Sequence, residues 1–322
     1  MTSDVRAGHI GLAAGLLWIL SGVPAHANLI INPSFDGSVP SSAQAAFNTA
    51  AAVLEGLYAY TGGANTITVN IDVTFAGSCT GNCLGSTTQT LVQTTYSAWR
   101  TAMQTDSTAN PGNPFLADGI AASLPAGSSP LGSDIVQITQ ANANVLGLFT
   151  PSGGAEATIA FSPDQPYEYT GVATSGDYDF INVAEHEMDE TLAIGTALNT
   201  GFGLPGYMPE DYFRYASAGV RSALTASATA YFSYNGGVTL GPQFNQNTSG
   251  DINDWASGAT LVQNAFIDSG VVATYNSGSP EYAVLNTLGY DGVGPEPATW
   301  VLMGAGLAGM LFFRQRLAGS KR

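Results

Sequence analysis

Apolar and polar residues alternate most clearly over residues 66–75, where threonine, asparagine and aspartate occupy the even positions. The apolar residues fall at the odd positions: Ile67, Val69, Ile71, Val73 and Phe75. This period of two predicts a half-buried strand. A second short apolar stretch, residues 157–162, ends at Pro163 and predicts an edge strand, because proline cannot continue a ladder of hydrogen bonds. Such an edge could pair with an extended peptide.

Helical spacing governs four other segments. Residues 43–60 are rich in alanine with apolar residues at near-helical spacing, and residues 279–288 begin with Ser-Pro, a typical helix start. An amphipathic helix is also predicted from the apolar positions Val92, Tyr96, Trp99 and Met103. Residues 177–198 predict a longer helix that ends near the Asn-Thr-Gly at residues 199–201. Mixed strands and helices without an internal repeat indicate one α+β domain over residues 28–294.

The first 27 residues have the pattern of a signal peptide. Arg6 and His9 precede the apolar residues 10–23, and Ala25-His26-Ala27 offers small residues at a cleavage site. Signal peptidase is therefore an expected partner, and the mature chain is expected to begin near Asn28. Export also favours a disulfide between Cys79 and Cys83, the only cysteines in the chain.

The far end of the chain, residues 295–322, has an unusual composition. Pro295-Glu296-Pro297 is followed by the uncharged apolar residues 298–313 and then by a basic cluster that begins at Arg314. The apolar run is short for a free-standing membrane span. This arrangement resembles a PEP-CTERM sorting tag, which implies export in a Gram-negative bacterium, transient anchoring in the membrane and processing by an exosortase. An ordinary C-terminal membrane anchor is the alternative.

Between these two ends the chain is strongly acidic. Residues 28–294 contain three basic residues, Arg100, Arg214 and Arg221, and all of the chain's 24 acidic residues except Asp4 and Glu296. Such a domain repels nucleic acids and anionic lipids, so we expect no nucleic-acid partner. It would tolerate bound cations.

The candidate chemistry centres on residues 181–190, Ile-Asn-Val-Ala-Glu-His-Glu-Met-Asp-Glu. His186 is the one histidine left after removal of the signal peptide, and Glu190 lies four residues later, one helical turn away. The pattern is that of the zinc-binding His-Glu-x-x-His motif, with glutamate in place of the second histidine. A carboxylate can bind zinc. We therefore predict His186 and Glu190 as metal ligands and Glu187 as the general base.

The third ligand is expected to be a carboxylate, water or tyrosine, because the mature chain has no second histidine. The nearest downstream candidates are Glu210 and Asp211. Arg214 and Arg221 flank the same segment, and Arg214 is predicted either to bind a substrate carboxylate or to neutralise the acidic residues near the metal. A structural ion pair with Asp211 or Glu210 is the alternative for Arg214.

Residues 178–190, 211–216 and 285–291 together resemble a family of PEP-CTERM-associated bacterial metalloproteases with a histidine-glutamate motif. The resemblance implies a zincin-like domain with a small mixed sheet and an active-site helix, Zn²⁺ as cofactor, and endopeptidase activity on a protein or peptide substrate. It favours Asp211 over Glu210 as the residue brought to the site, and a ligand role for Asp211 is our inference. Ala193 and Thr196 stand where longer metzincin motifs have glycine and a third histidine.

A second hypothesis is a non-catalytic relative at the cell surface or in the extracellular matrix that binds Ca²⁺. Asp251, Asn253 and Asp254 offer the oxygen ligands that calcium prefers. Asparagine-rich turns produce the same spacing without an ion.

Overall fold

The structure is a computed structural model, and it describes residues 27–60, 66–77, 79–198, 203–256 and 258–292. The described residues belong to one compact unit, Ala27–Val293. The predicted signal peptide (up to residue 26) and the predicted tag lie outside the described residues. In the described part of the chain no helix has both the length and the apolar character to cross a membrane.

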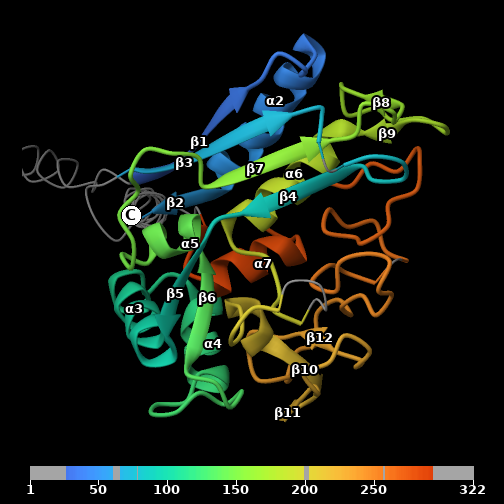
Figure 1. The fold of residues 1–322 in the computed structure, drawn as a ribbon. Coiled ribbons are helices and arrows are strands. Elements are labelled where there is room, and N and C mark those ends of the chain that lie inside the picture. Colours follow the sequence, from blue (N-terminus) through green and yellow to red (C-terminus); the bar gives the residue numbers. More distant parts are fainter. Residues whose placement is uncertain (1–26, 61–65, 78, 199–202, 257, 293–322) are drawn as a thin grey trace, which may run out of the picture. The chain divides into compact units, whose positions relative to one another are not determined.

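A six-stranded mixed sheet forms the upper part of the compact unit in Figure 1, with the strand order β13-β2-β1-β3-β7-β4. Its three central strands are parallel: β1 (Ala27–Phe35), β3 (Ile67–Thr74) and β7 (Ala157–Phe161). The other three are antiparallel to their neighbours: β2 (Tyr58–Tyr60), β13 (Asp291–Gly292) and β4 (Gly85–Gln89). The strand β4 therefore forms one edge of the sheet.

Two helices cover this sheet. Helices α2 (Ser41–Leu57) and α6 (Phe180–Leu192) pack against each other, while α2 also contacts β1 and α6 contacts β4. The apolar face of β3, with Val69 and Ile71, joins Phe47 of α2 and Phe180 of α6 in one buried cluster. Burial of this apolar surface is the main source of stability for the sheet and its helices.

The remaining elements form smaller layers around α6 and α7. The helices are α3 (Tyr96–Ala109), α4 (Pro114–Ser123), α5 (Gln140–Val145), α7 (Pro280–Thr287) and the 3₁₀ helix η1 (Pro209–Phe213). The strands pair as β5 (Leu91–Thr95) with β6 (Ile135–Thr139), β8 (Tyr167–Glu168) with β9 (Tyr178–Asp179), and β10 (Arg214–Ser217) with both β11 (Val220–Arg221) and β12 (Tyr231–Phe232). The fold is α+β, as the sequence predicted, but it contains several sheets where one small mixed sheet was expected.

Several local predictions are confirmed. The alternating segment forms β3 with its odd positions buried, and the alanine-rich segment forms α2. Pro280 occupies the first turn of α7 behind Ser279. Cys79 and Cys83 form a disulfide.

Three local predictions are wrong. The strand at residues 157–161, β7, is not an edge strand but lies between β3 and β4, because Pro163 comes after the last paired residue. Val92 belongs to β5 rather than to the helix that contains Tyr96. Helix α6 stops at Leu192, where the hydroxyls of Thr139 and Tyr290 both donate to the Leu192 carbonyl and so replace a further helical turn.

Glu156, just before β7, provides a test of stability against pH. Its carboxylate oxygens are buried without a hydrogen-bond partner, and burial raises its pKa from 4.5 to about 7. The folded state then holds this proton more tightly than the unfolded state, so stability should fall as the pH rises through that interval. In urea titrations at about pH 5 and about pH 8, Glu156→Gln should reduce the loss of stability between the two pH values. An equal loss in both proteins would contradict this assignment.

Candidate metal centre

Helix α6 places two of the predicted ligands one turn apart. The Asp179 carboxylate caps the helix by accepting a hydrogen bond from the Ile181 amide at 2.9 Å. Further along, His186 Nε2 lies 4.0 Å from Glu190 Oε1. Both side chains are largely removed from solvent, so His186 and Glu190 provide two candidate ligands of a buried site.

The third member of the cluster is Asp254. Its Oδ2 lies 3.6 Å from His186 Nε2, and one ligand atom from each of His186, Glu190 and Asp254 can be chosen so that all three lie within 4.8 Å of one another. The other oxygen of Asp254, Oδ1, accepts hydrogen bonds from Asn253 Nδ2 and Gln263 Nε2, both at 3.0 Å. These contacts leave Oδ2 directed at the histidine.

The tautomer of His186 is fixed by a backbone carbonyl. His186 Nδ1 lies 3.1 Å from the Val262 oxygen, and since a carbonyl can only accept, Nδ1 carries the hydrogen. The lone pair of Nε2 then faces Glu190 and Asp254. Metal-binding histidines usually donate such a hydrogen bond from the ring nitrogen that does not bind the metal.

The charges of the cluster suit a cation. Burial, followed by the nearby Glu187 and Asp254, raises the pKa of Glu190 well above its ordinary value. Burial also raises the pKa of Asp254 to about 7. Burial alone would lower the pKa of His186, but Asp254 and Glu187 outweigh it and raise the pKa. One imidazole nitrogen and two carboxylates fit a divalent transition metal such as zinc, because the metal would offset the repulsion between the carboxylates.

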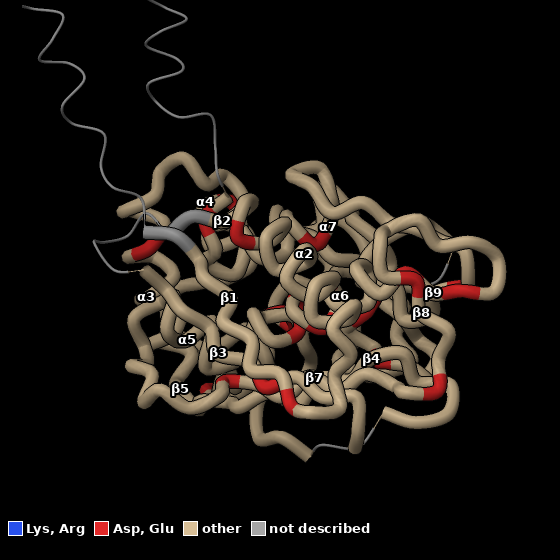
Figure 2. Tube along the Cα trace, turned by 90° about the horizontal axis from the view of Figure 1, so that it is seen from above, with Lys and Arg blue, Asp and Glu red and all other residues tan. Residues whose placement is uncertain are grey.

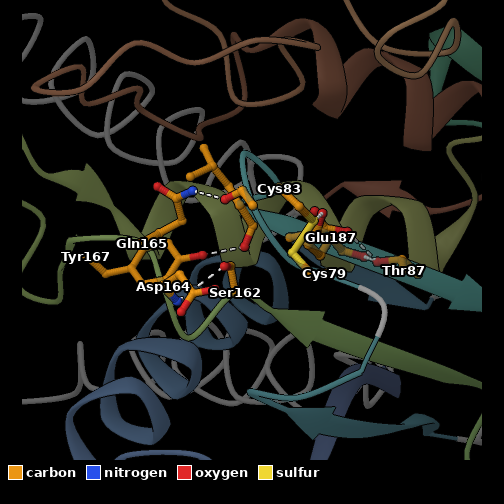
Figure 3. Close-up of a disulfide and its surroundings, with 11 residues drawn as sticks. Cys79, Cys83, Thr87, Ser162, Asp164, Gln165, Tyr167 and Glu187 are labelled. Carbon is orange, nitrogen blue, oxygen red and sulfur yellow. Dashed lines mark hydrogen bonds between the residues drawn. A yellow bond between two sulfur atoms is a disulfide. The ribbon is translucent and has the colours of Figure 1, made fainter.

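Glu187 lies on the side of α6 that faces the edge strand. Thr87 Oγ1 of β4 donates to Glu187 Oε2 at 2.7 Å, and the side chain is buried. Gly85 makes this approach possible, since a Cβ at that position would lie 2.3 Å from Glu187 Oε1. Figure 3 shows Glu187 and Thr87 beside the Cys79–Cys83 disulfide, at the start of β4. Burial raises the pKa of Glu187, as expected for a group that can take up a proton.

Asp211 and Glu210 lie outside this cluster of described residues. Asp211 accepts hydrogen bonds from the amides of Ala197 and Met208 at 3.0 and 2.9 Å and so joins η1 to the chain that leaves α6. Glu210 Oε2 accepts from the Gly195 amide at 3.1 Å. Both carboxylates thus shape the loop after α6.

Arg214 is buried and stacks on Phe244, with its guanidinium carbon 3.9 Å from the ring centre. Its Nη1 donates to the Ile252 carbonyl at 3.1 Å, two residues before Asp254. Asp211 and Glu210 lie close enough to counteract the effect of burial, which lowers the pKa of this guanidinium. The position fits charge neutralisation and support of the Asp254 loop better than contact with a substrate. Acidic positions are visible along the trace around α6 in Figure 2.

Asp254 could be recognised in part from the sequence. The Asp-Ile-Asn-Asp run at residues 251–254 offers oxygen ligands. In the sequence analysis these residues were candidates for a calcium site and not for the site of His186. In the structure Asn253 Nδ2 donates to Glu190 Oε1 at 3.2 Å, so this run and α6 belong to the same centre.

Comparison with known protein families finds the PEP-CTERM protein-sorting motif at residues 295–316. The motif indicates an exported, cell-surface protein and implies processing by an exosortase. Neither the curated proteins nor the solved structures contain a match. No zincin family is identified by these comparisons.

Proposed function

We propose that the protein is an exported zinc-dependent peptidase of the zincin type. The observation that carries this proposal is the convergence of His186, Glu190 and Asp254 on one point, with Glu187 beside them on the same helix. A histidine, a following glutamate and a ligand one turn later form one arrangement used for metal-dependent peptide hydrolysis.

Each residue has a distinct part in this proposal. Zinc, when bound, would polarise a peptide carbonyl and lower the pKa of a bound water to about 7. His186, Glu190 and Asp254 would hold the metal, and the Val262 carbonyl keeps His186 Nε2 free for that purpose. Glu187 would accept the proton of the attacking water at Oε1, while Thr87 holds Oε2 in place.

The strand β4 supports a peptide as the substrate. It is the edge strand of the six-stranded sheet, and its Thr87 contacts the proposed base directly. Extended peptides bind such edges by adding a strand, which aligns their backbone along the sheet. The edge strand that the sequence placed at residues 157–162 is thus replaced by β4 in this role.

Metal analysis of the protein purified in its exported form tests the proposal. We expect about one zinc per chain after dialysis without chelator, and loss of that zinc in His186→Ala. A bound zinc that survives His186→Ala, or calcium alone, would overturn the zinc centre and favour the non-catalytic calcium-binding alternative.

Gly85→Ala tests the proposed contact between β4 and the base. The new methyl group would lie 2.3 Å from Glu187 Oε1 and 2.7 Å from its Cδ and Cγ, so this buried side chain would have to move. We expect some loss of stability and a loss of hydrolysis of about 100-fold, because the base is displaced. Gly37→Ala is the control, since its methyl group would meet nothing within 4 Å. Equal activity of both variants would contradict the placement of Glu187.

A further inference from the structure

A second group of buried oxygen atoms lies away from His186, where α3 ends and β13 begins. Asp106 and Asn110 belong to the end of α3, and Asp291 belongs to β13. Asn110 Nδ2 donates to Asp106 Oδ1 at 2.9 Å, and Asn113 Nδ2 donates to Asp291 Oδ1 at 3.1 Å. The exposed fractions of Asp106, Asn110 and Asp291 are 7%, 6% and 4%.

Two oxygens in this group are buried without a hydrogen-bond partner. They are Asp106 Oδ2 and Asn110 Oδ1. The first faces the turn between α7 and β13, where it lies 3.5 Å from the position that a Cβ on Gly289 would occupy. Buried polar atoms are rarely left without a partner, because the loss of hydration is costly. These two oxygens can therefore bind a ligand, and the amide oxygen of Asn110, unlike the carboxyl group of Glu156, cannot be satisfied by taking up a proton.

The electrostatic surroundings of Asp106 are acidic. Burial, followed by the neighbouring Asp291, raises the pKa of Asp106 to about 8, and no basic residue is among the groups that affect it. Helices α3 and α7 both end here, and neither has a basic residue in its last turn. The C-terminal end of a helix carries partial negative charge, so both helix ends favour a cation at this place.

We propose that Asp106, Asn110 and Asp291 bind a calcium ion. Two carboxylates and an amide oxygen are hard ligands without nitrogen or sulfur, which favours calcium over zinc. Calcium also accepts irregular geometry and completes its coordination with water, whereas magnesium requires a nearly regular octahedron. This site is separate from the proposed zinc centre and does not depend on the proposed function.

The ion would join elements that are distant in the sequence. It would tie the end of α3 to β13, the strand at the other edge of the six-stranded sheet from β4. Because β13 is the last described strand before the sorting motif, calcium would hold the C-terminal end of the folded unit in place outside the cell.

Thermal unfolding of the exported protein with a calcium chelator or with millimolar calcium tests this site. We expect calcium to raise the unfolding midpoint by roughly 5 °C in the wild type. The shift should be retained in His186→Ala and in Asp118→Asn, a matched change at an exposed aspartate on α4. It should be lost in Asp106→Asn. A shift that disappears in His186→Ala would place the calcium at the other centre and overturn the proposal.

Asn110→Asp provides a second variant that does not remove a ligand. A third carboxylate should lower the midpoint without calcium and enlarge the shift that calcium produces. A wild type that does not respond to calcium, together with an Asp106→Asn variant that is more stable at about pH 8, would show that Asp106 holds a proton and would overturn the proposal.

Discussion

Glu187→Gln is expected to keep the bound metal and to lose peptide hydrolysis by a factor of about 10² to 10⁴, the usual contribution of a general base. The amide has the shape of the carboxylate and can still accept the hydrogen bond from Thr87, but it cannot take up a proton. Since Glu187 is not among the three clustered ligands, the metal content should not change. Fluorescently labelled casein and elemental analysis measure the two quantities.

Glu185→Gln is the matched control for this variant. Glu185 is buried on the same helix and accepts a hydrogen bond from Asn182. Burial raises its pKa to about 8, so at neutral pH the amide replaces a carboxylic acid that is already mostly uncharged. This control should retain hydrolysis. Full activity in Glu187→Gln would exclude Glu187 as the base.

Asp254→Asn is expected to weaken metal binding by more than about 100-fold. Removal of a residue that only supports a metal ligand weakens binding by up to about 100-fold, and loss of a ligand itself should have a larger effect. The change removes a negative charge from an atom that faces His186 Nε2. Competition with a chelator of known affinity measures the loss.

Asp211→Asn distinguishes the metal ligand predicted from the sequence from Asp254, the candidate that the structure places beside His186. Its carboxylate accepts hydrogen bonds from the loop after α6, so we expect a loss of stability of about 1–3 kcal/mol with the metal retained. If Asp211→Asn lost the metal and Asp254→Asn kept it, the structural assignment of the third position would be wrong.

Local sequence patterns were sufficient to predict several elements of the fold and two residues of the candidate site. The alternation over residues 66–75 identified β3, and the spacing of His186 and Glu190 placed them on one face of α6. Both inferences depend only on the geometry of a single element. The disulfide could be predicted for the same reason, because Cys79 and Cys83 are four residues apart.

Contacts between distant segments could not be predicted from the sequence. Asp254 meets His186 through the irregular chain after β12, and no spacing rule connects the two positions. The two strands beside β7, β3 and β4, could not be predicted either. An apolar run of five residues has the same composition at the edge of a sheet and inside it. Closeness in sequence suggested Glu210 and Asp211, and the family resemblance favoured Asp211. In the structure Asp211 instead accepts hydrogen bonds from Ala197 and Met208.

The long interval between the motif on α6 and Asp254 bears on the timing of maturation. A growing chain contains His186, Glu187 and Glu190 well before Asp254 has been synthesised, and the three-residue cluster needs all of its members. An unfinished or truncated chain therefore displays the whole motif without a complete centre. The cluster cannot assemble before the segment that contains Asp254 has folded, so a cell that exports the chain before it folds would be protected from the proposed peptidase activity until the chain is outside.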